Sequence, residues 1–438
     1  MISAEEAHKL GIAFSYAEYC EKKDDYQIDG EYFLVMRKHA FLYYEPGKGK
    51  TYPAIAAIRE VAMDGKVLIL STADSVRQMW EAEIVPQDVL PINTVIMSFT
   101  KAIQDKVKPQ LLSVKWDVIL VDESHKVKSN TAQISKLLHK LTRKVPYVWG
   151  LSGTPRGNSE LDIFCQFHNL NVADWGDITY TQFINTCCDV EKQYGPYGMF
   201  TKVLGINDKY RAGWERNVAM YTQRVSYEEG EMPELDIQEV KIKYEKTELY
   251  KNALQGVIML DDFATTMTKL VAINKCQQIC NGFVYYTDEV TDEKQTYVAE
   301  HTLHNYKIDY LKEHIHKDEP VVVVYLFAQD LTNLRAAFPQ GTEDIAEFKR
   351  GQSNLLFLQC SRCESFNLQR CKFMYFYTMD CSYIKFKQMM HRIYRRGQED
   401  KVTIRVLVHE DTIEENIWKI VKNKKSAADL FMAIKEGA

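Results

Sequence analysis

The sequence lacks a run of 18 or more apolar residues, so we expect no membrane-spanning helix and no membrane partner. Residues 1–6 are acidic and contain no apolar core, so we expect no secretory signal peptide. The ten cysteines are scattered through the chain without an export signal. We therefore expect reduced thiols in a cytoplasmic protein.

The chain also has no excess of basic over acidic residues. The chain has 55 Lys and Arg against 60 Asp and Glu, a net charge of −5, so any binding of nucleic acid must come from local patches. Its 46% hydrophobic and 26% charged residues exclude a disordered, collagen-like or coiled-coil chain. The length of 438 residues suggests two to three domains.

Short apolar runs alternate with longer amphipathic stretches, which is typical of an α/β fold with largely parallel sheets. In the first half we expect strands at 41–44, 67–70, 94–97, 118–121 and 148–151. In the second half we expect them at 321–326, 355–358, 373–377 and 402–408. Two such sets of strands predict two sheets.

The charged stretch at 227–233 contains a glycine and a proline, and we place the domain boundary near it. The predicted domains are therefore 1–232 and 233–438. Within the second domain we expect a helical segment at 245–282 and a C-terminal helix at 412–436.

A strand, a glycine-rich turn and a helix follow one another at 41–62, as a phosphate-binding P-loop requires. Gly47 and Gly49 would let backbone N–H groups approach a phosphate, at the positive end of the helix. Lys50 is expected to reach the β- and γ-phosphates of ATP, and the Thr51 hydroxyl to bind Mg²⁺. The alternative is a glycine-rich turn with an incidental Gly-Lys-Thr.

An apolar strand at 118–121 ends in two adjacent carboxylates. The carboxyl ends of strands are where α/β proteins bind ligands. We expect Asp122 to hold Mg²⁺ through water and Glu123 to orient and deprotonate the attacking water. A solvated acidic turn is the alternative, but the full Asp-Glu-x-His pattern that ends at His125 favours the catalytic interpretation.

Further motifs occur in a fixed order. They are Tyr26-Gln27, Asp122-Glu123-Ser124-His125, Leu151-Ser152-Gly153-Thr154-Pro155, Gln278-Ile279-Cys280-Asn281, and Gln388 with Arg392, Arg395, Gly397 and Gln398. With these motifs the chain resembles superfamily 2 helicases and translocases, most closely the Swi/Snf-related branch. The resemblance covers roughly residues 22–422. It implies two tandem RecA-like domains, each a mostly parallel sheet flanked by helices, with a helical insertion in the second half.

The resemblance also implies roles for single residues. Gln27 would read the adenine, and His125, Ser152, Thr154 and Gln388 would couple the nucleotide site to nucleic acid. Arg392 and Arg395 would lie across the domain cleft from ATP, where an arginine that neutralises the γ-phosphate is worth ~10³–10⁵ in rate. Being three residues apart, they would share one face of a helix. A solvated basic helix is the alternative.

Contacts to nucleic acid are expected from Thr100, Lys101, Lys128 and Arg362, each of which is equally consistent with a solvated surface residue. Arg362 lies in the segment 361–368, where the family has glycines and this chain has none. We also expect no flanking chromatin-reading domains. The resemblance is therefore to a compact motor of a bacterium or of a phage-infected host.

The sequence thus predicts a nucleic-acid-dependent ATPase that uses ATP and Mg²⁺ to translocate on double-stranded DNA, and to remodel or unwind it. A helicase acting on forked DNA or on RNA is the alternative among enzymes, with single-stranded DNA or RNA as its substrate. Outside that class, the alternatives are a non-hydrolysing nucleic-acid-binding module or a subunit of a restriction or repair complex. The presence of Lys50, Asp122, Glu123 and Arg395 argues against a module that does not hydrolyse ATP.

Overall fold

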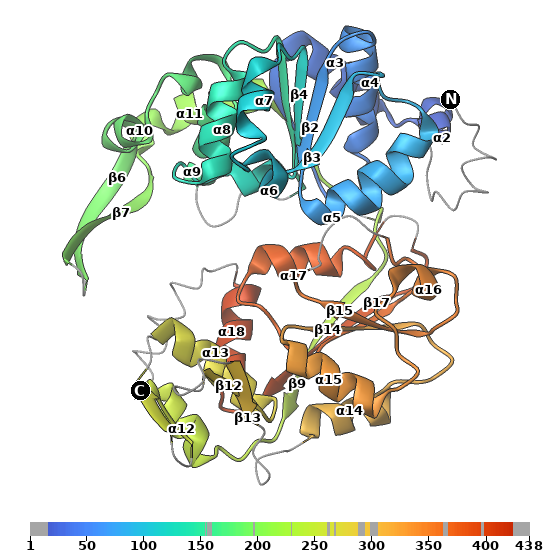
Figure 1. Cartoon of the computed structure of the whole chain (residues 1–438), viewed down its shortest axis with the longest axis vertical. Coiled ribbons are helices and arrows are strands. Elements are labelled where there is room, and N and C mark those ends of the chain that lie inside the picture. The colour runs from blue at the N-terminus through green and yellow to red at the C-terminus, as the bar shows by residue number, and fades with distance from the viewer. Residues whose placement is uncertain are drawn as a thin grey trace. The chain divides into compact units, whose positions relative to one another are not determined.

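The computed structural model describes residues 16–153, 155, 160–195, 198–228, 230–260, 263–266, 269–287, 294–297, 305–361, 367–395 and 398–423. These residues form two compact units, one up to residue 228 and the other from Gly230 onwards (Figure 1). Each unit has its own parallel sheet. None of the described helices has both the length and the apolar character needed to cross a bilayer.

The sheet of the first unit has the strand order β3-β2-β4-β5-β1-β8, and all neighbours are parallel. Its strands are β1 (His39–Tyr44), β2 (Val67–Ser71), β3 (Thr94–Ser98), β4 (Val118–Asp122), β5 (Tyr147–Leu151) and β8 (Thr222–Val225). Both β2 and β4 are buried along their whole length, because helices cover both faces of a parallel sheet.

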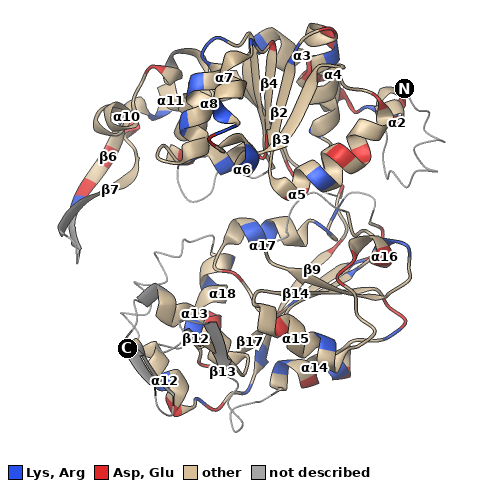
Figure 2. Cartoon of the chain, viewed as in Figure 1, with Lys and Arg blue, Asp and Glu red and all other residues tan. Residues whose placement is uncertain are grey.

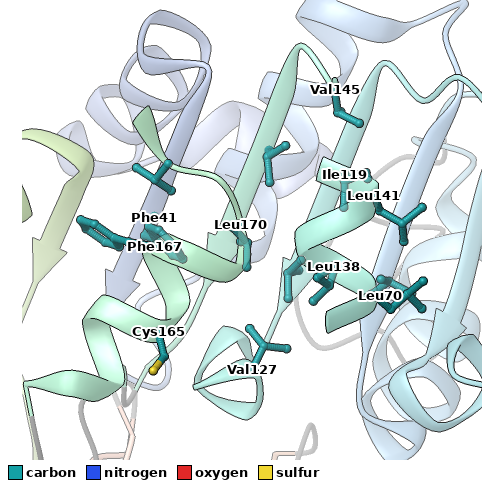
Figure 3. Packing of buried hydrophobic residues seen from close by; sticks show 14 of the residues in the cluster. Phe41, Leu70, Ile119, Val127, Leu138, Leu141, Val145, Cys165, Phe167 and Leu170 are labelled. Atoms are coloured by element: carbon teal, nitrogen blue, oxygen red, sulfur yellow. The ribbon is translucent and has the colours of Figure 1, made fainter. Parts of the chain in front are cut away.

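The helices of this unit include α2 (Tyr16–Lys22), α3 (Asp25–Arg37), α4 (Thr51–Ala62), α5 (Ala73–Ser75), α6 (Phe99–Ala102), α7 (Lys108–Ser113), α8 (Gln133–Thr142), α9 (Leu161–Asn169), α10 (Tyr180–Cys187) and α11 (Asp208–Tyr221). Successive side chains of a strand point to opposite faces, so β1 contributes to two cores. Phe41 joins the cluster that contains Leu138 and Phe167 (Figure 3), and Leu42 joins the cluster that contains Ile55.

An antiparallel hairpin extends away from the first sheet (Figure 1). Its strands are β6 (Cys188–Gly195) and β7 (Gly198–Ile206). Val190 and Leu204 on this hairpin are exposed. Alternating apolar residues did not mark either strand. Only the ends of the two strands, at Cys188 and Ile206, are seen to pack against the core among the residues whose burial is described.

The sheet of the second unit has the order β15-β14-β16-β17-β9, again with all neighbours parallel. Its strands are β9 (Leu235–Ile242), β14 (Val321–Tyr325), β15 (Leu355–Gln359), β16 (Phe373–Phe376) and β17 (Val402–His409). Its helices include α12 (Glu248–Leu254), α13 (Lys269–Cys280), α14 (Tyr306–His314), α15 (Ala328–Ala337), α16 (Ile345–Lys349), α17 (Tyr383–Met390) and α18 (Ile413–Lys422). A small hairpin joins β12 (Val284–Thr287) and β13 (Lys294–Tyr297).

Every strand expected from the sequence is present, and the α/β class with two parallel sheets is confirmed. The segment at 245–282 contains two helices, but they are separated by the hairpin of β10 (Val257–Leu260) and β11 (Phe263–Thr266). Gly256, with φ +86°, follows the end of α12, and the β-branched Val257 and Ile258 then favour a strand. Of the helix expected at 412–436, residues 424–436 lie outside the described part of the chain.

The core of the second unit contains an ion pair shielded from solvent. Nζ of Lys307 on α14 lies 2.5 Å from Oε1 of Glu414 on α18, and the two side chains are 2% and 5% exposed. The other carboxylate oxygen accepts a hydrogen bond from the backbone N–H of His409 at 3.0 Å. Burial by itself raises the pKa of Glu414, but Lys307 and His409 outweigh it and hold that pKa at about 2.

We expect this pair to make the unit sensitive to acid. The folded-state pKa lies below the usual value of 4.5, so the contribution of Glu414 is complete above about pH 4.5 and is lost as the pH falls towards 2. Glu414→Gln should lower the free energy of unfolding at neutral pH by about 3–5 kcal/mol, because Lys307 stays buried without its counter-ion.

Denaturant unfolding between pH 7 and pH 3 checks this expectation. The wild type should lose more stability over this range than Glu414→Gln. Glu415→Gln is the matched control, because its partner Lys241 is 52% exposed and surface pairs are worth about 0–1 kcal/mol. Parallel pH profiles for the wild type and Glu414→Gln would contradict the assignment.

Candidate nucleotide-binding site

The carboxyl edge of the first sheet brings the predicted site residues together. The P-loop follows β1, Asp122 ends β4, and Ser152 follows β5. Because these strands are parallel neighbours, their carboxyl ends meet at one edge. This topology positions residues that are more than 70 positions apart in the sequence.

The P-loop has the backbone conformation that its glycines allow. Gly47 has φ +95° and Gly49 has φ +70°, a region that other residues rarely adopt. A Cβ atom on Gly49 would lie 2.6 Å from Nε2 of Gln27, so a larger residue would also collide there. The loop leads into α4 at Thr51, so the positive end of that helix lies at the loop.

Gln27 lies against this loop. Its Nε2 donates to the carbonyl oxygen of Lys48 at 3.3 Å, and the Tyr26 hydroxyl donates to the same oxygen at 3.3 Å. The backbone N–H of Asp24 donates to Oε1 of Gln27 at 3.0 Å, which sets the orientation of the amide. Gln27 thus connects the start of α3 to the P-loop, while its role in reading adenine stays a prediction.

Lys48 and Tyr227 were not foreseen from the sequence. The Nζ atom of Lys48 lies 5.1 Å from the ring centre of Tyr26 and 4.7 Å from that of Tyr227, distances typical of cation–π contacts. Tyr227 also donates from its hydroxyl to the carbonyl of Pro46 at 2.7 Å and from its backbone N–H to Glu45 at 3.0 Å. The contacts therefore join the P-loop to the residues that follow β8.

Lys50 and Glu123 face each other in the site. Lys50 Nζ is 3.8 Å from Oε1 of Glu123, and both side chains are largely buried. Glu123 has φ +53°, a left-handed conformation that costs a non-glycine residue about 1–3 kcal/mol. Such strain is typical of functional positions, and here it places the carboxylate beside the P-loop lysine.

Asp122 is held by three donors on one oxygen. Its Oδ2 accepts from Ser71 Oγ at 2.9 Å, Ser75 Oγ at 3.0 Å and Trp80 Nε1 at 3.2 Å. Burial, followed by the charge of Glu123, raises the pKa of Asp122, and Lys50 opposes the rise. A divalent cation would favour the ionised form, and the carboxylate and hydroxyl oxygens of Asp122 and Thr51 are the donors that Mg²⁺ prefers.

Two polar links join the acidic motif to the segment after β5. His125 Nδ1 lies 3.1 Å from Ser152 Oγ and 3.1 Å from Oε2 of Glu123. The backbone at Gly153 lies so close to Pro46 that a Cβ atom added to the glycine would be 2.9 Å from the proline ring. This segment therefore also lies against the P-loop. Thr154, the other predicted coupling residue here, lies outside the described residues.

Gln166 on α9 provides the second link and was missed from the sequence. Its Oε1 accepts from Ser124 Oγ at 2.9 Å, and its Nε2 donates to the carbonyl of Pro155 at 2.8 Å. The side chain is fully buried. A glutamine on the otherwise apolar stretch Ile163–Phe167 was the available signal, since buried polar groups need partners.

Three of the four candidate nucleic-acid contacts lie near the same edge. Thr100 and Lys101 are exposed on α6, directly after β3, where Figure 2 shows a basic segment. Lys128 follows the acidic motif and lies 3.3 Å from Asp162 in an ion pair. Arg362 lies outside the described residues. These contacts remain predictions.

In the second unit, Gln388 is buried on α17, but the two arginines do not share a helix face as expected. The helix ends at Met390, and Arg392 and Arg395 follow it. The carbonyl of Arg392 accepts from the N–H of Leu368 at 2.9 Å, so it is engaged outside the helix. Arg392 Nε donates to the carbonyl of Gln388 at 3.0 Å, whereas Arg395 is half-buried.

Comparison with known proteins supports an ATPase of the helicase and translocase class. Within that class, a family model described as SNF2-related domain matches residues 66–195. The match covers 130 of the 438 residues, and the predicted resemblance to SNF2-related, ATP-dependent helicases is confirmed. The family implies the use of ATP.

Two curated relatives illustrate the similarity. The uncharacterized ATP-dependent helicase YqhH of Bacillus subtilis is 24% identical over 430 residues, which cover 89% of this chain and 75% of the relative. The second relative is the SWI/SNF-related matrix-associated actin-dependent regulator of chromatin subfamily A-like protein 1 of Drosophila melanogaster. It is 23% identical over 435 residues, which cover 91% of this chain and 54% of the relative. This chain thus spans about half of the Drosophila protein.

A solved structure is also similar. It is the Sulfolobus solfataricus SWI2/SNF2 ATPase core in complex with dsDNA, which is 16% identical with a TM-score of 0.41. The match covers 92% of this chain and 91% of that one.

Proposed function

We propose that this chain hydrolyses ATP with Mg²⁺ in order to translocate on double-stranded DNA. The observation that carries the proposal is the pairing of Lys50 and Glu123, 3.8 Å apart, beside Asp122 at the carboxyl edge of a parallel sheet. This is the arrangement that phosphoryl transfer to water needs. Duplex DNA is supported by the SNF2-related match and by a relative named as a regulator of chromatin, in which DNA is double-stranded.

The contacts suggest how ATP would change the site. Lys50 Nζ lies 3.8 Å from Oε1 of Glu123. The β- and γ-phosphates would draw Lys50 away, and Glu123 would then be free to accept the proton of the attacking water. Thr51 and Asp122 would hold Mg²⁺, which offsets phosphate charge when bound. His125 would pass the change in Glu123 on to Ser152.

Lys50→Ala tests this assignment. We expect ATP turnover to fall by ~10²-fold or more, the scale of losing a donor that stabilises transition-state charge. Binding of duplex DNA should change by no more than a few-fold, because Thr100, Lys101 and Lys128 are untouched. Steady-state ATPase rates and a DNA titration measure the two quantities.

The control for this test is Lys66→Ala. Lys66 is an exposed lysine just before β2, at the opposite edge of the same sheet. The Lys66→Ala variant should have the same ATP turnover and the same affinity for duplex DNA as the wild type. Turnover of Lys50→Ala within a few-fold of the wild type would show that the P-loop assignment is wrong.

A further inference from the structure

The end of α13 carries buried polar side chains that the proposed chemistry does not use. Gln277, Gln278 and Asn281 are all buried. Gln277 Nε2 donates to the carbonyl of Met379 at 3.0 Å. Asn281 Nδ2 donates to Thr378 Oγ1 at 2.7 Å and to Asp330 Oδ1 at 2.9 Å. Gln277 on α13 and Asn281, which directly follows that helix, thus bind consecutive residues just after β16.

Lys307 binds the residue before these two. Its Nζ donates to the carbonyl of Tyr377 at 2.8 Å, to Asn281 Oδ1 at 3.0 Å and to Glu414 Oε1 at 2.5 Å. An ammonium group has three N–H donors, so every donor of Lys307 has an acceptor. Residues 377–379 are therefore each held by a side chain from α13, from the residue that follows α13, or from α14. An unpaired polar group in this region would be costly.

The held segment leads directly into α17. Asp380 follows Met379, and its Oδ1 accepts from the backbone N–H of Ser382 at 2.9 Å. Its Oδ2 pairs with Lys385 Nζ at 2.7 Å. Ser382 is the N-cap residue of α17, where its hydroxyl accepts from the N–H of Lys385. Hydrogen bonds therefore continue without a break from residue 377 into the first turn of this helix.

The other end of α17 leads to the residues that the resemblance places opposite the γ-phosphate. Gln388 lies in its last turn, and Arg392 Nε bonds to the Gln388 carbonyl just beyond it. Phe386 packs against Phe376 on β16, with ring centres 4.9 Å apart. A helix held both at its first turn and along its length transmits a displacement at residues 377–379 to the arginines that follow it.

We propose that Gln277, Asn281 and Lys307 are positioning residues for Arg392 and Arg395. They touch no nucleotide phosphate; they hold the segment from which α17 begins, and through it they set where the two guanidinium groups lie. The proposal rests on the proposed function and on the expectation from the resemblance that these arginines act on the γ-phosphate. It also gives a role to the Gln-Ile-Cys-Asn motif, because Asn281 is its last residue.

The test compares two adjacent glutamines on α13. Gln277→Met removes the bond to Met379 while keeping the length and burial of the side chain. Gln278→Met is the matched control, because Gln278 is equally buried but its Oε1 accepts from the backbone N–H of Tyr285 at 3.0 Å, on β12. The measurements are kcat at saturating duplex DNA, the Kd for ATP and the thermal unfolding midpoint.

We expect Gln277→Met to lower kcat by about 10- to 100-fold, the scale of misplacing a catalytic group by about 1 Å. The Kd for ATP should change less than two-fold, since the P-loop belongs to the other unit. Gln278→Met should shift the thermal unfolding midpoint by about as much as Gln277→Met does, but its kcat should stay near that of the wild type. A purely structural role would move only the midpoint.

Equal kcat values for the two variants would overturn the proposal, provided that the wild type turns over ATP. A wild type without turnover would instead reject the proposed function, so the two failures are distinct. If Gln277→Met does not fold, Thr378→Val decides the matter, because it removes the acceptor of Asn281 with little change in shape. A drop in its kcat without a change in the Kd supports the proposal, and an unchanged kcat contradicts it.

Discussion

Replacing Arg395 by alanine is expected to lower kcat by ~10³-fold or more while the affinity for ATP changes little. Arg395 belongs to the second unit, whereas Lys50, Thr51 and Asp122 belong to the first. An arginine that meets the phosphates only as charge builds on the transferring group contributes to kcat and to kcat/KM together. The KM for ATP should therefore stay nearly constant.

Further variants test the chemical reason for this loss. Arg395→Lys should restore little activity, because a planar guanidinium matches phosphate oxygens in a way that an ammonium does not. Arg350→Ala, at an exposed arginine of the same unit, serves as the control and should leave kcat unchanged. An equal loss of affinity and turnover in Arg395→Ala would make Arg395 a ground-state ligand. If neither quantity changes, Arg392 or another cation has the catalytic role.

Glu123→Gln is expected to bind ATP and to hydrolyse it ~10²–10⁴-fold more slowly, the scale of losing a general base. An amide cannot accept the proton of the attacking water. The substitution keeps the side chain's size but weakens its contacts with Lys50 at 3.8 Å and His125 at 3.1 Å. Losing the Lys50 contact should slightly raise the affinity for ATP, because Lys50 then binds the phosphates without first giving up its ion pair with the Glu123 carboxylate.

Nucleotide titration and single-turnover hydrolysis measure the two effects of Glu123→Gln separately. Glu60→Gln, at an exposed position on α4, is the control and should match the wild type in both. If Glu123→Gln fails to bind ATP, the role of Glu123 is structural. Its left-handed backbone would then serve only to shape the turn after β4.

The sequence predicted much of the nucleotide site because parallel strands have a simple consequence. Once the apolar runs before Gly47, Asp122 and Ser152 were assigned as parallel strands, their carboxyl ends had to lie at one edge. The residue types there then indicated the chemistry. The same reasoning predicted both sheets, since strands buried on both faces form uninterrupted apolar runs.

Other features depend on contacts that no local pattern contains. Tyr227 reaches Pro46 across 181 positions, and Gln166 reaches Ser124 across 42. The end of α17 at Met390 could not be read from a spacing of basic residues, because Leu368 engages the carbonyl of Arg392 from outside the helix. Tertiary structure determines where such a helix ends and which distant residues form these hydrogen bonds.

The most direct test of the proposed motor is steady-state ATP turnover by the full chain in four conditions: without nucleic acid, with single-stranded DNA, with duplex DNA and with RNA. The account predicts low turnover alone and the largest stimulation by duplex DNA. The stimulation should fall as salt rises, because phosphate contacts dominate binding. Equal turnover in all four conditions, or stronger stimulation by RNA or single-stranded DNA than by duplex, would contradict translocation on double-stranded DNA.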